Sequence, residues 1–98
     1  MGDRIVYGSR DATGLTHVYV VDTASGVTRE LAAGRTEPAF LTPRFIWYAG
    51  ERLCIPSDSC GPGVQVVPSG KTYVYDLEDG FETESNITHV DDIWPHAA

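Results

Sequence analysis

The sequence predicts an all-β protein made of short antiparallel strands, and two observations support this prediction. Runs of β-branched and aromatic residues recur along the 98-residue chain, and turn-forming residues separate them. The ten glycines and six prolines are widely spread, and no stretch places apolar residues at helical spacing over a useful length. The expected strands are residues 4–9, 16–22, 27–31, 38–41, 45–48, 72–76, 81–84 and 90–94.

The composition of each run indicates its place in a sheet. Residues 18–21 read Val-Tyr-Val-Val, and successive side chains of a strand point to opposite faces, so this strand is expected to be covered on both faces. Residues 45–48 and 72–75 are likewise rich in aromatic and β-branched side chains. The runs at 27–31 and 81–84 are largely polar, which is typical of outer or edge strands.

The chain also contains an internal repeat. A shift of 54 residues places the segment 19–22 (Tyr-Val-Val-Asp) on 73–76 (Tyr-Val-Tyr-Asp), and it places Phe40 on Trp94. Residues 5–7 match 46–48 at a shift of 41, so the second copy contains a 13-residue insertion. Each copy thus predicts four strands at a period near 41 residues, which is typical of a β-propeller blade.

Several motifs sharpen this interpretation. An apolar strand ends in Ser9-Arg10-Asp11 with Gly14 close behind, a strand of the "IYVMD" type follows, and a glycine turn leads to Arg29-Glu30-Leu31. Residues 38–43 then read Pro-Ala-Phe-Leu-Thr-Pro, and 92–95 read Asp-Ile-Trp-Pro, with Asp92 at the position of the first proline. The pattern resembles the TolB-like, WD40-like β-propeller repeat and covers all but the insertion. The resemblance implies the fold but no particular activity, because such propellers serve as binding scaffolds, peptidase lids and partners in envelope complexes.

We expect residues 1–98 to form one two-blade unit, with a first repeat at 4–41 and a second at 44–95 that carries an inserted loop at 53–70. Propellers have about four to eight blades, so two blades do not close a ring. We therefore expect homo-oligomerisation with strand exchange, in which the last strand (90–95) closes onto the first blade of a neighbouring chain. Three chains would complete a six-bladed propeller and four an eight-bladed one. The alternative is a piece of a longer propeller. The ring-closing residues would be Val90, Asp91, Asp92, Ile93 and Trp94.

The insertion is expected to be a loop, with a further hairpin strand at residues 64–67 as an alternative. The two cysteines, Cys54 and Cys60, lie within it. Their spacing allows a disulfide, and free thiols, a metal site or a redox site remain alternatives. A disulfide would favour a periplasmic or extracellular location. The first residues run directly into a strand-like pattern and show no features of a signal peptide.

A second group of polar residues falls on or beside the two innermost strands. Glu37 and Asp91 occupy equivalent positions of the repeat, and His89 and Asp92 lie beside the latter. In a closed ring these residues would line the channel rim, either as a solvated polar surface or as ligands of a divalent cation. The aromatic side chains are expected to pack between blades, with a sugar-binding surface as the alternative.

The overall charge of −7 argues against nucleic acid as a partner, and no apolar run is long enough to cross a membrane. The sequence contains no nucleophile motif, phosphate loop or zinc-protease motif. We therefore expect a non-enzymatic scaffold without a cofactor that binds a protein or small ligand on its loop face, which holds residues 32–37, 53–70 and 86–89. The alternatives are the gating propeller of a prolyl-oligopeptidase-like peptidase, of which this would be a fragment, and a lectin-like ring.

Overall fold

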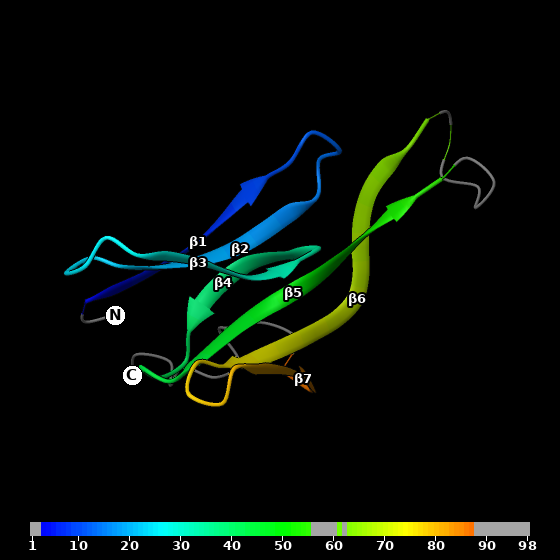
Figure 1. Cartoon of the computed structure of the whole chain (residues 1–98). Helices are drawn as coiled ribbons and strands as arrows, with labels where there is room; N and C mark the ends of the chain where they lie inside the picture. Colours follow the sequence, from blue (N-terminus) through cyan, green and yellow to red (C-terminus); the bar gives the residue numbers. More distant parts are fainter. Residues whose placement is uncertain (1–2, 56–60, 62, 88–98) are drawn as a thin grey trace, which may run out of the picture.

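The computed structural model describes residues 3–55, 61 and 63–87 of the chain. These residues form two antiparallel sheets, one of three strands in the order β1-β2-β3 and one of four in the order β4-β5-β6-β7 (Figure 1). The strands are β1 (Arg4–Arg10), β2 (Thr16–Asp22), β3 (Thr28–Ala33), β4 (Arg35–Phe40), β5 (Phe45–Cys54), β6 (Gln65–Asp76) and β7 (Phe81–Ser85). The all-β prediction is confirmed, and seven of the eight expected strands are present. The eighth, at 90–94, lies outside the described residues.

The strand pairing shows that the internal repeat is structural. In the first sheet, β1 pairs with β2 so that Tyr7 lies opposite Tyr19, and in the second, β5 pairs with β6 so that Tyr48 lies opposite Tyr73. The third strands keep the same register, because β3 places Glu30 opposite Tyr19 while β7 places its equivalent opposite Tyr73. The unit β5-β6-β7 therefore repeats β1-β2-β3, and β4 is the additional strand of the second sheet.

The turns repeat as well. The amide of Gly26 donates to the carbonyl of Asp22 at 2.7 Å, and the amide of Gly80 donates to the carbonyl of Asp76 at the same distance. Both glycines have positive φ, 75° and 76°, which a glycine adopts without steric cost. The edge positions predicted for the polar runs are confirmed, since β3 and β7 each end their sheet.

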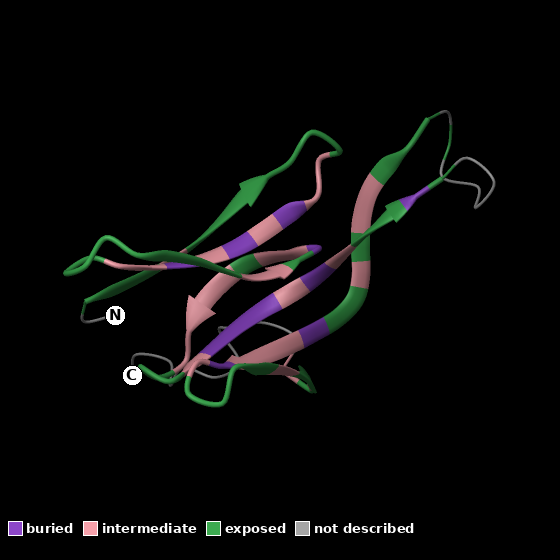
Figure 2. Cartoon of the chain, in the orientation of Figure 1, coloured by how far each residue is buried: buried purple, intermediate pink, exposed green. Residues whose placement is uncertain are grey.

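The core lies between the two sheets. Val18 of β2 packs with Ile46 and Tyr48 of β5, and all three are fully buried. Trp47, between the last two, is also buried, so β5 is covered on both faces (Figure 2). The expectation for residues 18–21 holds for one face only, because Val18 and Val20 are buried while Tyr19 and Val21 are half-buried. One face of the first sheet thus packs on the second sheet, and the other is an outer face.

The loop expected at 53–70 is shorter in the structure, and residues 65–67 of the alternative hairpin strand at 64–67 belong to β6. β5 and β6 continue into the insertion as a two-stranded ribbon whose pairing runs from Glu51 opposite Pro68 to Cys54 opposite Gln65. The hairpin extends beyond the other strands of its sheet (Figure 1). The physical reason is that both arms of the hairpin gained residues, so they continue to satisfy one another's backbone groups. Pro68 is tolerated because the ribbon has open edges there.

One of the two expected four-stranded sheets is present in full, as β4-β5-β6-β7. The first sheet has three strands, and its fourth was expected from a neighbouring chain; the described residues contain no counterpart of β4 for it. No closed propeller is formed by the described residues. In the part of the chain that the structure describes, no helix could cross a membrane.

Candidate functional site

The edge of the first sheet formed by β1 carries exposed apolar side chains. Among the described residues, β1 is hydrogen-bonded in a ladder to β2 alone, although it also lies near β4. Ile5 is 53% exposed and Tyr7 is 39% exposed, and only Val6 of this strand is half-buried (Figure 2). A strand with an open edge and apolar side chains is a template for pairing with another strand.

The outer face of the first sheet continues this surface. The rings of Tyr7 and Tyr19 stack with centroids 5.4 Å apart, and the ring of His17 stacks on Tyr19 at 6.5 Å. Their repeat equivalents in the second sheet, Tyr48 and Tyr73, lie in or beside the core against the first sheet. The same face is therefore covered by a sheet in one copy of the repeat and exposed in the other.

His17 is held between two carboxylates on this outer face. Its Nε2 lies 2.6 Å from Oδ2 of Asp11, and its Nδ1 contacts Oε1 of Glu30. Asp11 also accepts hydrogen bonds from the hydroxyl and the amide of Thr13, and together with His17 these lower its pKa to about 2. The hydrogen bonds to Asp11 and Glu30 raise the pKa of His17. The group links the β1–β2 turn to β3.

Sequence reasoning assigned nothing to His17, although the repeat contains a signal. The equivalent residues in the second copy are Lys71 and Glu84, whose charged atoms lie 4.0 Å apart. An opposite-charge pair therefore recurs at this position in both sheets. In the first sheet the cation is a histidine, whose charge depends on pH near neutrality.

The junction between the sheets is built around Gly34. Its amide donates to the carbonyl of Thr16 at 2.9 Å, and its carbonyl accepts from the amide of Glu51 at 2.8 Å. The side chain of Glu51 returns to the first sheet, where Oε1 accepts from the amide of Thr16 at 2.9 Å. These contacts fix how the chain passes from β3 to β4.

Just beyond this junction, Arg35 anchors the start of β4. Its Nε and Nη2 donate to the two carboxylate oxygens of Glu82 at 2.9 and 3.0 Å, and its guanidinium lies 3.8 Å from the centroid of the Tyr73 ring. Although burial opposes it, this pairing lowers the pKa of Glu82. The ion pair ties the first strand of the second sheet to its last one.

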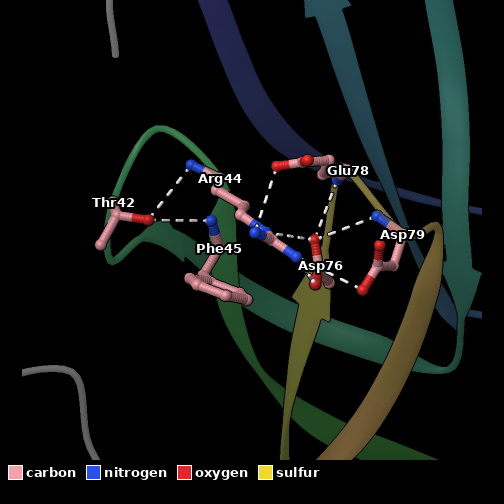
Figure 3. A network of polar contacts seen from close by, with 6 residues as sticks. All are labelled: Thr42, Arg44, Phe45, Asp76, Glu78 and Asp79. Atoms are coloured by element: carbon pink, nitrogen blue, oxygen red, sulfur yellow. Dashed lines mark hydrogen bonds and ion pairs between the residues drawn. The ribbon is translucent and has the colours of Figure 1, made fainter.

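At the opposite end of the strands, Arg44 lies among three carboxylates (Figure 3). It makes two 2.8 Å hydrogen bonds to Asp76, and ion pairs with Glu78 at 3.1 Å and Asp79 at 3.3 Å. Asp76 also accepts from the amides of Glu78 and Asp79, which closes the β6–β7 turn. The hydrogen bonds from Arg44 hold the pKa of Asp76 far below its ordinary value. Since Arg44 is bound on several sides, the cluster is a structural clamp.

The predicted channel-rim residues are described only in part. Glu37 is exposed and lies in β4, where the pairing with β5 is interrupted between Thr36 and Ala39. Its φ of 56° is unusual for a residue other than glycine. His89, Asp91 and Asp92 lie outside the described residues. Among the residues that are described, no group of His, Cys, Asp or Glu could hold a metal ion.

Only one of the two cysteines lies within the described residues. Cys54 ends β5, is fully buried and is disulfide-bonded. Cys60 lies outside the described residues, so the pairing of Cys54 with Cys60 stays a prediction.

Two grooves lie at the end of the strands opposite the predicted loop face. One, of about 370 Å³, runs between the β2–β3 turn and Leu77, and the other, of about 280 Å³, lies beside it next to Arg44. Both are lined by Arg4 and Leu77. The described part of the predicted loop face instead holds the Gly34 junction and the base of the β5–β6 ribbon.

Comparison of the chain with protein-family models, curated proteins and solved structures finds no match.

Proposed function

We propose that this protein is a non-enzymatic β-propeller module that assembles from identical chains. The observation that carries the proposal is the repeat register: β1-β2-β3 matches β5-β6-β7 strand for strand, yet the first sheet lacks a counterpart of β4 among the described residues. A second chain would supply that strand. This arrangement would pair the open edge of β1 and reduce the exposure of Ile5 and Tyr7.

The repeat also specifies how the added strand would lie. β4 places Phe40 opposite Ile46 and Ala39 opposite Trp47 on β5. Carried over at the two repeat shifts, this register would place Trp94 of one chain opposite Ile5 of the next, and Ile93 opposite Val6. Trp94 would then cover the exposed side chain of Ile5, as Phe40 packs against the core that contains Ile46. The interruption of strand pairing beside Glu37 would have its equivalent at Asp91.

The repeat also indicates which sheet faces of neighbouring chains would pack together. Within the chain, Val18 and Val20 of the first sheet face the second sheet, and their equivalents in the second sheet are Thr72 and Val74 on β6. The side of the second sheet that carries Val74 would pack on the outer face around Tyr19 of the next chain. Such contacts join unlike surfaces head to tail, and they close into a ring when the rotation per chain allows it. Three chains would give the six blades of the TolB-like resemblance.

A closed ring would leave its loop face available for a protein or small ligand, with the β5–β6 ribbon as its largest projection.

A fragment of a peptidase-gating propeller is the second candidate, and the open edge of β1 also supports it, because missing blades of a longer chain could cover that edge. A lectin-like ring would need an exposed aromatic surface after assembly, whereas the proposed packing covers Tyr7 and Tyr19.

The decisive experiment is the solution mass measured by light scattering on a sizing column across a range of concentrations. A stable mass of three or four chains is the expected result. A monomer at every concentration, or an aggregate without fixed mass, would contradict self-assembly and favour a fragment.

Trp94→Ala tests the register, with His96→Ala as the control just beyond the closing strand. Because a buried tryptophan at an interface is worth about 2 kcal/mol or more, Trp94→Ala should weaken association about 30-fold or more. It should also lower the melting temperature, while His96→Ala keeps the wild-type mass. An unchanged mass and melting temperature for Trp94→Ala would exclude the proposed strand.

A further inference from the structure

The larger of the two grooves at the end of the strands lies between the inner face of the first sheet and the β6–β7 turn of the second. Its volume of about 370 Å³ falls within the range of about 300–1,000 Å³ that is typical of small-ligand sites. Three apolar residues line it: Val20 is buried, Leu77 packs against the core, and Val27 is 64% exposed. The groove thus offers an apolar surface that begins in the core and ends in solvent.

Two arginines flank this apolar surface, one on each side of β2. Arg4 of β1 lies opposite Asp22, and Arg29 of β3 lies opposite Val20. Residues that lie opposite one another in a sheet share a face, so both arginine side chains extend from the face that carries Val20. Arg29 is exposed, and its side chain makes no ion pair or hydrogen bond with another described residue. Its guanidinium is therefore available to a ligand.

The other polar groups of the groove favour a single negative charge on that ligand. Oδ1 of Asp22 accepts from the amides of Ala24 and Ser25 at 2.9 and 3.3 Å, so the β2–β3 turn binds this carboxylate. Two arginines and one aspartate give the lining a net charge of +1. Oγ of Ser25 accepts from the amide of Val27 at 3.3 Å, which leaves the hydroxyl proton of Ser25 to donate.

The neighbouring groove, of about 280 Å³, has a different charge. Its Arg44 is bound by three carboxylates at the β6–β7 turn (Figure 3). Because these carboxylates outnumber the arginine, an anion gains no attraction beside Arg44. The end of the larger groove beside Arg29 is therefore the favoured position for an anion.

We propose that the larger groove binds a monocarboxylate that carries a short apolar chain. Arg29 donates a charge-assisted hydrogen bond to the carboxylate, and Ser25 adds its hydroxyl. The apolar chain lies on Val20, Val27 and Leu77 and removes their surface from water. The site lies within one chain, at the end of the strands opposite the loop face, so it does not depend on assembly. A free organic acid and the C-terminus of a peptide that ends in an apolar residue both present this chemistry.

The test is a titration of the full chain followed by nuclear magnetic resonance of its backbone amides. The probes are hexanoate, N-acetylleucine and the neutral hexanol. Arg29→Met removes the proposed contact to the anion, and Arg52→Met, on the exposed part of β5, removes the same charge outside the groove. Val27→Ser removes apolar surface at an exposed position. Circular dichroism verifies the fold of each variant.

Hexanoate should bind the wild type with a dissociation constant in the millimolar range and shift the amides around Val20, Ser25 and Leu77. Because Arg29 makes a hydrogen bond between charged groups, Arg29→Met should weaken hexanoate about tenfold, and Arg52→Met less than about twofold. Val27→Ser should weaken hexanoate and hexanol alike. Hexanol should bind several-fold more weakly than hexanoate to the wild type.

The two carboxylates distinguish the sources of the ligand. Tighter binding of N-acetylleucine would assign the groove to a peptide C-terminus, and tighter binding of hexanoate would assign it to a free organic acid. If hexanol binds as tightly as hexanoate, or if Arg29→Met and Arg52→Met weaken hexanoate equally, recognition of the anion is wrong. If no probe shifts the amides around the groove, the groove is not a binding site for this chemistry.

Discussion

The carbonyl of Gly34 accepts a hydrogen bond from the amide of Glu51 at 2.8 Å, and this contact joins the two sheets where the chain passes between them. Gly34 is buried and has a φ of 69°. A Cβ atom at this position would lie 3.1 Å from the carbonyl oxygen of Glu51. The junction therefore requires glycine for its backbone conformation and also for the space around it.

Gly34→Ala should destabilise the protein more than Gly26→Ala does. Gly26 has a similar φ of 75°, but an added Cβ would meet nothing within 4 Å there. The left-handed conformation alone costs about 1 kcal/mol, and the clash in Gly34→Ala should raise the total to about 2–4 kcal/mol. Urea denaturation of both variants measures the difference. Equal losses would mean that the Glu51 carbonyl moves freely aside.

Removal of the polar atom should lower the free energy of unfolding at Trp47 but change it little at the neighbouring Tyr48. Nε1 of Trp47 donates to the carbonyl of Ile87 at 2.8 Å, whereas the buried hydroxyl of Tyr48 makes no hydrogen bond of ordinary geometry among the described residues. It lies near the carboxylate of Glu82, but Arg35 already binds both oxygens of that carboxylate. Trp47→Phe should cost about 1–3 kcal/mol through the lost hydrogen bond and the lost volume, although the carbonyl of Ile87 still accepts from the hydroxyl of Thr72 at 2.6 Å. Tyr48→Phe should stay within about 0.5 kcal/mol of wild type or gain stability. A large loss for Tyr48→Phe in chemical denaturation would reveal a partner for its hydroxyl.

The ion pairs of Arg44 should make the free energy of unfolding depend on pH in the acidic range. Because Arg44 holds the folded-state pKa of Asp76 far below its unfolded value, this contribution is complete above about pH 4 and declines as pH falls toward the folded pKa. Arg44→Met should thus lower the urea midpoint clearly at pH 7 and much less near pH 2. Arg52→Met, on the exposed part of β5, is the control and should change little at either pH. A constant difference between Arg44→Met and wild type would contradict the linkage.

Reduction should loosen the tip of the β5–β6 ribbon and leave the sheets intact. Cys54 is the last residue of β5, well beyond Ile46 and Tyr48 in the core. Hydrogen exchange should therefore increase at residues 51–55 and 65–68 after reduction, while the far-ultraviolet circular dichroism of the sheets is retained. Global unfolding on reduction would show that the disulfide supports the core itself.

Alternation and repeat spacing were sufficient to predict the strands and their order. Equivalent residues have equivalent partners on the neighbouring strand: Tyr19 lies opposite Glu30, and Tyr73 lies opposite Glu84. The alternation of side chains along each strand and the repeated register determine such pairs. Only one arm of the ribbon, at 64–67, was considered as a strand, because the prolines and glycines of the insertion indicate a loop when each arm is taken alone. Its pairing depends on two segments meeting, Glu51 through Cys54 with Gln65 through Pro68.

The His17 group shows a different limit. Asp11, His17 and Glu30 come from a turn and two strands, and only the fold brings their side chains together. The repeat alignment with Lys71 and Glu84 indicated a charged pair but not the third partner. Glu37 was expected just before the strand at 38–41, and the structure places it within β4. Its φ of 56° accompanies the interrupted pairing of β4 and β5, which no local pattern encodes.

The β5–β6 ribbon has a consequence for the use of this fold as a carrier. Its two arms lengthen together, and below Ala49 the pairing is the same as in the shorter β1–β2 hairpin. A foreign peptide grafted at its tip would therefore be held away from the body of the molecule without disturbing the core. In a ring of three chains, the same graft would display three copies of an epitope around a common axis.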